Sequence, residues 1–278
     1  MSALPSTPTR FDSEGGFPPL PNLPPSMARA KPTLEPADLA LCRSALWEAL
    51  ALGFRPPTAE TVTRLVAGEG ARALAAAAAV LDEADGSGLE PLVLALAVEP
   101  PPSLEPLRLA HGRFFGHTAR SEAPPYETEY GEDSIWEPQR EMSDLGAFFR
   151  AFGLRVSAEA RERPDHIACE CEFLLVLARK EARAQALGDE PAREATCQAA
   201  RLFLRDHLGH WAPALGAKLS RLDPDGFYGA LGRLLAAFVV GECRRAGVAA
   251  GPAFLRLRSA EPDDTPMACG PLATAPDA

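Results

Sequence analysis

The sequence predicts an all-α protein, a single compact bundle of about ten helices with disordered termini. Three observations favour this fold class. Apolar residues recur at spacings of three and four positions through most of the chain, as they do on the buried face of a helix. Proline and glycine divide this pattern into segments of helical length. Apolar and polar residues do not alternate over the length of a strand, so no sheet is expected.

The two ends of the chain, residues 1–33 and 259–278, are expected to be disordered tails around an all-helical domain of residues 34–258. The first tail contains eight prolines and the second contains four. Proline fixes φ and removes a backbone hydrogen-bond donor, and neither tail has many apolar residues to bury. We therefore expect neither tail to join the core.

Ten segments between the tails have helical patterns. In the first, an apolar stripe runs from Leu39 to Phe54, and prolines at positions 56 and 57 stop the helix. Ser103 has the side chain of an N-cap for a later helix. Residues 116–136 form the longest irregular segment, and a loop of that length in a compact domain is usually functional or mobile. The expected helices cover residues 37–54, 58–67, 71–84, 89–98, 104–115, 138–152, 164–187, 191–208, 212–219 and 224–245.

Charge and cysteine content exclude some classes of protein. The formal net charge of −10 and the isoelectric point near 5.1 argue against a nucleic-acid-binding protein, which needs a basic surface. The six cysteines form no C-x-x-C pair, so we expect thiols in a reducing compartment. Neither a secretory signal nor a membrane-spanning apolar run is recognised, so the expectation is a cytoplasmic protein without stable membrane insertion.

Residues 163–173 concentrate side chains that are capable of chemistry. Pro164 suits the first position of a helix, where its missing N–H has no helical partner to lose. Asp165 would then lie in the first turn, where the helix dipole favours negative charge. One face of this helix would carry His166, Cys169, Glu170 and Phe173.

One interpretation of that face is a metal-binding or enzymatic site. His166, Cys169 and Glu170 could supply nitrogen, sulfur and oxygen ligands from one helix. A di-metal carboxylate bundle, however, needs the order Glu-x-x-His on two helices, and the order here is reversed and occurs once. The sequence also contains no G-x-S-x-G motif and no glycine-rich phosphate loop. The metal or enzyme hypothesis therefore remains the alternative, and no cofactor is expected.

Three stretches of the sequence, taken in order, carry a resemblance to a known family. They are residues 111–116 (HGRFFG) with 124–127 (PPYE), residues 163–173 (RPDHIACECEF), and residues 203–211 (FLRDHLGHW) with 227–228 (FY). In this order they resemble the TorD/DmsD/NarJ family of cytoplasmic chaperones, which mature molybdenum-containing oxidoreductases. The resemblance covers roughly residues 37–246. Residues 130–153 are most similar to the branch that serves the type II dimethyl sulfoxide reductase family.

The resemblance implies an all-helical protein that is not an enzyme. It would bind the apo catalytic subunit of a molybdoenzyme, often at an N-terminal twin-arginine leader peptide, assist insertion of the molybdenum cofactor and delay export. Whether the chain is a monomer or a homodimer stays open, as does a role as an assembly subunit that remains in the complex. In the family an Asp-His pair and the loop before it contribute to leader binding. Carried over, the implied site is Asp165, His166, Pro125 and Tyr126, with Phe114 and Phe115 as nearby apolar contributors.

The chemistry of such a leader indicates candidate site residues that partly repeat this set. A leader that is basic and then apolar needs a receptor with carboxylates beside an apolar groove. Exposed acid–arginine pairs contribute only about 0–1 kcal/mol each, so affinity should rest mainly on the apolar segment. The candidate acids are Asp165, Glu127, Glu129 and Glu170. The candidate apolar contacts are Tyr126, Phe114, Phe115 and Phe173.

Several of these residues also have structural interpretations. Phe114 and Phe115 are adjacent, so at least one should face the core. Glu170 and Glu172 cannot both be buried without partners, so one of them either pairs with an arginine from another helix or binds a ligand. Core positions are expected for Trp211, Phe227 and Tyr228, and positions at a helix C-terminus for His207 and His210.

Overall fold

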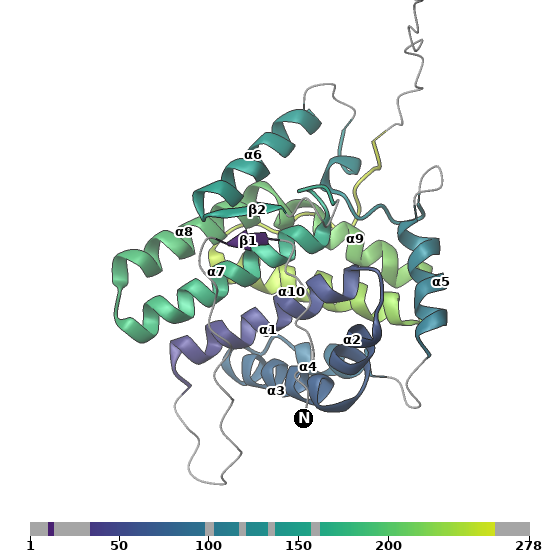
Figure 1. Ribbon diagram of the computed structural model, residues 1–278, viewed down its shortest axis with the longest axis horizontal. Coiled ribbons are helices and arrows are strands. Elements are labelled where there is room, and N and C mark those ends of the chain that lie inside the picture. Colours follow the sequence, from purple (N-terminus) through teal and green to yellow (C-terminus); the bar gives the residue numbers. More distant parts are fainter. Residues whose placement is uncertain are drawn as a thin grey trace, which may run out of the picture.

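The computed structural model describes residues 11–13, 34–97, 103–116, 121–132, 137–156 and 162–258 of the chain. Within these residues the protein is a bundle of ten α-helices (Figure 1), which confirms the predicted fold class. Most of the predicted tails, residues 1–10, 14–33 and 259–278, lies outside the described residues. No helix in the described part of the chain combines the length and the apolar character needed to cross a bilayer.

The observed helices follow the predicted segments one for one, with the second prediction divided between a helical turn and a π-helical turn. The α-helices are α1 (Pro36–Phe54), α2 (Ala59–Thr61), α3 (Gly68–Asp85), α4 (Leu89–Leu94), α5 (Leu104–Phe115), α6 (Glu137–Ala151), α7 (Ile167–Leu187), α8 (Glu190–Asp206), α9 (Leu208–Leu222) and α10 (Phe227–Ala246). The π-helical turn η1 (Val62–Val66) follows α2, and the 3-10 turn η2 (Glu127–Glu129) lies in the loop before α6.

The core is built on two pairs of long helices. α1 packs along α7, and α9 packs along α10. Most of α1 is buried, and Leu46, Trp47 and Leu50 lie at the centre of the bundle. α6 lies at the edge of the bundle (Figure 1) and is attached by Phe149, which packs against Phe173 of α7 with ring centroids 5.3 Å apart. Together with Phe148, Phe149 also contacts Phe203, so aromatic packing attaches α6 to both α7 and α8.

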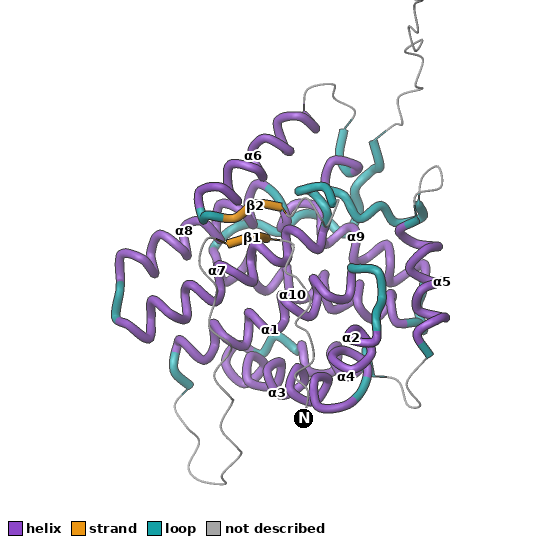
Figure 2. Tube along the Cα trace, in the orientation of Figure 1, coloured by secondary structure: helices purple, strands orange, loops and turns teal. Residues whose placement is uncertain are grey.

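The expectation of no strand pairing was wrong in one place. Strand β1 (Phe11–Ser13) pairs antiparallel with β2 (Leu154–Val156), with Phe11 opposite Val156, and the two strands are orange in Figure 2. β1 also lies inside the segment that was predicted to be disordered. A strand of three residues is too short for an alternating pattern, so periodicity could not reveal it.

Helix α9 begins four residues earlier than predicted, because Pro213 lies inside it rather than in its first turn. Proline has no N–H, so the carbonyl of Gly209, four residues earlier, receives no helical hydrogen bond. The N–H of Gly251 donates to this carbonyl instead, at 2.8 Å. A side chain at position 251 would overlap the backbone of His210, so only glycine can approach so closely. This bond attaches residues 251–258, the C-terminal strap, to α9.

Candidate functional site

The loop before α6 and the start of α7 are joined by backbone hydrogen bonds. The N–H of Ile167 donates to the carbonyl of Pro125 at 2.8 Å, and the N–H of Glu127 donates to the carbonyl of Asp165 at 2.9 Å. This pairing forms a loop–helix junction between two stretches that lie far apart in the sequence. The predicted site residues that meet at the junction are Pro125, Tyr126, Glu127, Asp165 and His166.

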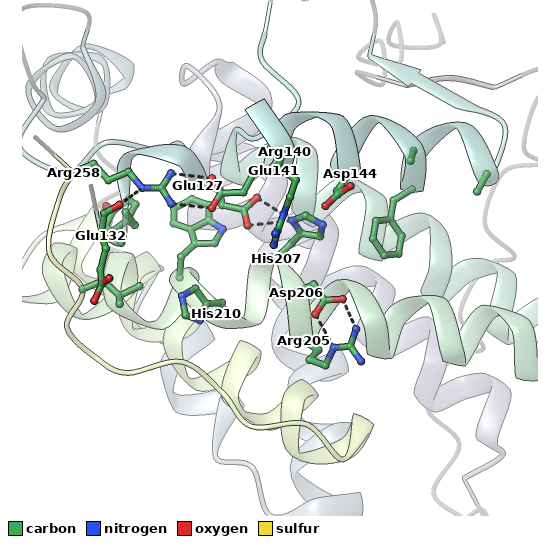
Figure 3. Close-up of a pocket in the computed structure, with 17 residues that line it drawn as sticks. Glu127, Glu132, Arg140, Glu141, Asp144, Arg205, Asp206, His207, His210 and Arg258 are labelled. Atoms are coloured by element: carbon green, nitrogen blue, oxygen red, sulfur yellow. Dashed lines mark hydrogen bonds and ion pairs between the residues drawn. The ribbon is translucent and has the colours of Figure 1, made fainter. Parts of the chain in front are cut away.

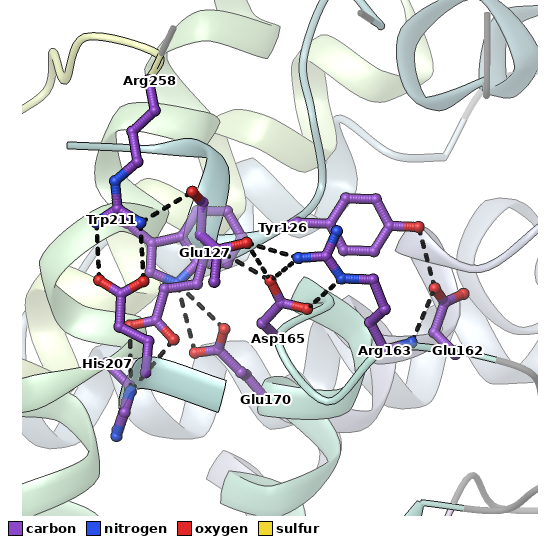
Figure 4. A network of polar contacts seen from close by, with 11 residues as sticks. Tyr126, Glu127, Glu162, Arg163, Asp165, Glu170, His207, Trp211 and Arg258 are labelled. Atoms are coloured by element: carbon purple, nitrogen blue, oxygen red, sulfur yellow. Dashed lines mark hydrogen bonds and ion pairs between the residues drawn. The ribbon is translucent and has the colours of Figure 1, made fainter. Parts of the chain in front are cut away.

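Asp165 is fully buried beneath this junction (Figure 4). Nε and Nη2 of Arg163 donate to its carboxylate at 3.0 and 2.7 Å, and the hydroxyl of Thr128 donates to it at 2.7 Å. The same guanidinium lies 4.5 Å from the ring centroid of Tyr126. Asp165 therefore holds the loop against α7, and its carboxylate is not presented at the surface as a recognition group.

His166, rather than Pro164, marks the start of α7. The helix begins at Ile167, so Asp165 precedes the helix instead of lying in its first turn as expected. Nδ1 of His166 accepts a hydrogen bond from the N–H of Ala168 at 3.1 Å, which makes the imidazole the N-cap. This bond requires Nδ1 to be unprotonated. The side chain is buried, with its ring 5.2 Å from that of Tyr126.

Glu127 connects the loop to the junction of α8 and α9. Its carboxylate oxygens lie 3.1 and 3.2 Å from Nδ1 of His207, which ends α8 as the sequence predicted. Both side chains are buried. Burial raises the pKa of Glu127, and the neighbouring His207 acts in the opposite direction. His210, predicted beside a helix end with His207, instead lies in the first turn of α9.

Glu170 is fully buried and faces α9, where Nε1 of Trp211 donates to its carboxyl group at 3.2 Å. Burial raises the pKa of Glu170 well above its usual value, and the charges of Glu127 and Asp165 raise it further. The neutral, protonated carboxyl is therefore favoured. Glu172 pairs with Arg55 at the end of α1, so of the two alternatives for these glutamates the structure shows the pairing with an arginine from another helix.

The geometry does not support a metal site on the face of His166, Cys169 and Glu170. All three side chains are buried, and Glu170 is directed to Trp211. Among the described residues, no group of three or more His, Cys, Asp or Glu side chains could hold a metal ion. The five described cysteines are thiols, as expected, and burial raises the pKa of Cys171 well above its usual value.

Phe114 and Phe115 belong to a separate aromatic cluster. Their ring centroids lie 5.8 and 5.3 Å from that of Tyr228, and both side chains are buried. They contribute to the loop only indirectly, through the carbonyl of Phe114, which accepts a hydrogen bond from the N–H of Ala123 at 3.1 Å. Phe173, also predicted as a leader contact, is buried under α6. Trp211, Phe227 and Tyr228 lie in the core, as the sequence predicted.

A solvent-open groove of about 1030 Å³ lies beside the loop–helix junction, between η2, α6, the start of α9 and the C-terminal strap (Figure 3). Glu127 forms part of its floor. Exposed Glu132 and Asp144 on its rim have carboxylates, and Phe148 and Leu255 supply apolar surface. The groove therefore combines acidic and apolar groups in one place.

The strap contains a residue that sequence reasoning missed, Arg258. The strap pairs with the loop through Leu257, which lies opposite Tyr130, and the guanidinium of Arg258 is bound by Glu141 of α6. Arg258 stands alone at the border of a predicted tail, without a motif around it. Its only signal in the sequence is that it follows a short segment, residues 253–257, in which Arg256 is the one polar residue. Glu129, a predicted acid, is half-buried and uses its backbone carbonyl to hold the strap.

Comparison with known proteins identifies the relatives of this chain. A chaperone protein TorD from Photobacterium profundum is 34% identical over 127 residues, which is 45% of this chain and 56% of that protein. The selenate reductase assembly chaperone protein of Thauera selenatis is 38% identical over 97 residues, 34% of this chain and 45% of its own length. The perchlorate reductase assembly chaperone protein of Dechloromonas aromatica is 34% identical over 96 residues, 34% of this chain and 42% of its own.

The chain thus spans about half the length of the curated relatives it matches. The family model described as nitrate reductase delta subunit matches residues 74–217, just over half of the chain. This range contains α5, the loop, α7, α8 and the start of α9, and therefore most of the groups at the loop–helix junction. The chain belongs to the nitrate reductase delta subunit family, the TorD/NarJ family that its motifs resemble.

Proposed function

We propose that this protein is a system-specific chaperone for the catalytic subunit of a molybdenum-containing oxidoreductase. It binds the apo subunit, its twin-arginine leader peptide or both, assists cofactor insertion and delays export, all in the cytoplasm. Family membership supports this function, as do the relatives that are named assembly chaperones for selenate and perchlorate reductases. The same two relatives favour a client from the type II dimethyl sulfoxide reductase family.

The main structural support for the proposal is the chemical character of the groove beside the loop–helix junction. It sets the exposed carboxylates of Glu132 and Asp144 beside the apolar side chains of Phe148 and Leu255. A leader that is basic and then apolar has the complementary order of groups. This match supports leader binding at the groove.

The predicted site residues have two kinds of role in this proposal. Asp165 and His166 are buried, as are Glu127 and Glu170, so they position the loop rather than touch the leader through their side chains. Tyr126 is half-buried and lies at the outer side of the junction, where its hydroxyl donates to Glu162 at 3.1 Å. The backbone carbonyls of Pro125 and Phe114 hold the loop, whereas Phe115 packs in the aromatic cluster beside it.

Calorimetry with a twin-arginine leader peptide, and copurification with a coexpressed apo catalytic subunit, test the function. We expect micromolar or tighter binding of at least one of them, and no copurification with mature enzyme. The control peptide has alanine in place of both arginines. The proposal fails if neither the leader nor the apo subunit binds. Copurification with mature enzyme would instead identify an assembly subunit that remains in the complex.

A further inference from the structure

The guanidinium of Arg258 lies in a pocket of hydrogen-bond acceptors at the edge of the groove (Figures 3 and 4). Its Nη1 and Nη2 donate to the two carboxylate oxygens of Glu141 at 2.9 and 2.8 Å. Nη1 also donates to the carbonyl of Thr128 at 2.9 Å, and Nε donates to the carbonyl of Glu132 at 3.0 Å. A planar guanidinium suits this fork of acceptors, and the ammonium group of lysine could not reproduce it. The pocket is therefore specific for arginine.

The backbone around this pocket pairs as two short extended segments. The N–H of Gly131 donates to the carbonyl of Arg256 at 2.9 Å, and the N–H of Arg258 donates to the carbonyl of Glu129 at 2.9 Å. Leu257 lies opposite Tyr130 in this antiparallel bridge. The loop edge is thus a template for one extended strand, which is a common way of binding peptides.

Gly131 shapes the pocket. Its φ of +114° favours glycine, and a side chain there would come within 3.3 Å of Nη2 of Arg258. The close approach of the guanidinium to the loop backbone therefore depends on the absence of a side chain at this position.

The groove without Arg258 would be strongly acidic. Among the described residues, five that line the groove have carboxylate groups, namely Glu127, Glu132, Glu141, Asp144 and Asp206. Three guanidinium groups, those of Arg140, Arg205 and Arg258, also line it. If the strap left, these five carboxylates would face only two of the three guanidinium groups. Glu141 would also lose its present partner. A basic side chain from another peptide could then replace Arg258.

We infer that this pocket is a binding site for an arginine side chain of an extended peptide, and that Arg258 fills it in cis as an autoinhibitory contact. The inference rests on the proposed function, because a twin-arginine leader supplies such a peptide. The strap itself, with apolar Phe254, Leu255 and Leu257 around two arginines, has similar chemistry. An incoming leader places one arginine against Glu141, pairs its backbone with the loop edge and lays its apolar part over Phe148.

The pocket is tested with a fluorescent synthetic peptide of residues 252–258, followed by anisotropy. The full-length Arg258→Ala protein should bind the peptide roughly tenfold more tightly than the wild type, if the strap is docked in about nine molecules of ten. The matched control is Arg256→Ala, an exposed arginine of the same strap, which should behave like the wild type. Adding Glu141→Gln to Arg258→Ala should abolish binding, as should alanine in place of the peptide's last arginine. Equal binding by Arg258→Ala and the wild type, or binding that ignores Glu141, overturns the inference.

Hydrogen–deuterium exchange on the unmodified protein provides a second measurement that does not depend on the folding of a variant. Addition of a twin-arginine peptide should increase exchange in residues 252–258, while residues 127–132 stay protected because the new strand replaces the strap. Unchanged exchange in the strap of a protein that has bound the peptide overturns the inference and leaves the proposed function standing. A different result would count against the proposed function. If the strap peptide binds Arg258→Ala but no leader or apo subunit binds any variant, the proposed function fails, and the leader is not the ligand of the pocket.

Discussion

Two clusters of buried charge in this protein differ in how they are satisfied. In the bundle, Arg43 of α1 lies 2.8 Å from Glu181 of α7 and 3.7 Å from Glu242 of α10. Within the part of the chain that the structure describes, its Nε and Nη2 have no hydrogen bond of good geometry, although the charges are close. At the loop, Arg258 makes aligned hydrogen bonds to a carboxylate and to two backbone carbonyls. Arg43 thus joins three helices by proximity of charge, whereas Arg258 joins a loop, a helix and the strap by directed bonds beside solvent.

Of these two clusters, only that of Arg258 can exchange its partners without unfolding of the bundle. All three charged groups of the Arg43 cluster lie on long helices that pack over much of their length, so no one of them can leave without opening the core. Arg258 belongs to a short strap and is the last residue of the chain that the structure describes. Its pocket opens on the groove. Directed bonds beside solvent can be replaced by those of another ligand, whereas a charge in the core cannot easily be re-solvated.

The largest effect is expected from breaking the core cluster. Arg43→Ala leaves the buried carboxylate of Glu181 without its arginine, whereas Glu242 keeps its two hydrogen bonds from Arg245. The free energy of unfolding should fall by about 3–5 kcal/mol, because the charge of Glu181 is left uncompensated. Urea denaturation measures the loss. The matched control is Arg244→Ala, an exposed arginine of α10, which should change stability by less than about 0.5 kcal/mol. A loss in Arg43→Ala as small as that of the control would remove the contrast between the two clusters.

A smaller effect is expected at the loop–helix junction. Asp165→Ala removes the buried acceptor for Arg163 and Thr128, but Arg163 is nearly half exposed and can be re-solvated. The expected loss in the free energy of unfolding is about 1–3 kcal/mol, with the helical circular dichroism preserved. Binding of the leader peptide should weaken as well, because the loop loses its anchor. An Asp165→Ala variant with wild-type stability and wild-type affinity would show that the junction does not organise the groove.

Glu170→Gln should produce a change that depends on pH. Because the pKa of Glu170 is raised in the folded protein, its contribution to stability is fully present below the unfolded pKa of about 4.3 and declines as pH rises toward the folded pKa. Each unit of that shift costs the wild type about 1.4 kcal/mol at a pH above both values. The glutamine cannot ionise and its carbonyl can still accept from Trp211. In thermal melts, the stability of Glu170→Gln relative to the wild type should therefore increase as the pH is raised from about 5 to about 8. A constant difference across this range would contradict the assignment of a neutral Glu170.

The smallest effect is expected from Tyr126→Phe. This change removes only the hydrogen bond from the tyrosine hydroxyl to Glu162 and keeps the ring beneath Arg163. The expected loss is about 0.5–1 kcal/mol in urea denaturation. Tyr126→Ala, which also removes the ring contact with His166, should cost more. If the two variants are equally stable, the ring does not contribute to the junction.

Much of the fold could be predicted from the sequence, because helix formation depends on local periodicity and on proline and glycine. The ten helices and most of their limits were predicted for this reason. The start of α9 could not be, since the helix tolerates Pro213 only through the distant N–H of Gly251. β1 was missed because three residues carry no periodicity. Both errors involve partners far apart in the chain.

The candidate site was predicted in part. The motifs indicated that the loop and the Asp-His pair belong together, and the backbone bonds between Pro125 and Ile167 show that they do. Burial could not be predicted, because it depends on which helices cover Asp165 and Glu170. Arg258 was missed because its role depends on Glu141 and on two loop carbonyls, which lie more than a hundred residues earlier in the chain.

The bond between Gly251 and Gly209 affects how strongly the strap competes with a leader peptide for the pocket. It fixes one end of the strap to α9, so the free length up to Arg258 is the seven residues 252–258, at most roughly 25 Å when extended. A tether of that length holds Arg258 near its pocket at an effective concentration of the order of millimolar. A leader peptide at micromolar concentration must therefore make contacts that the strap does not make, and a lone arginine would not suffice. Lengthening the strap between Gly251 and Phe254 would lower that local concentration and so adjust the threshold for client entry without altering the pocket.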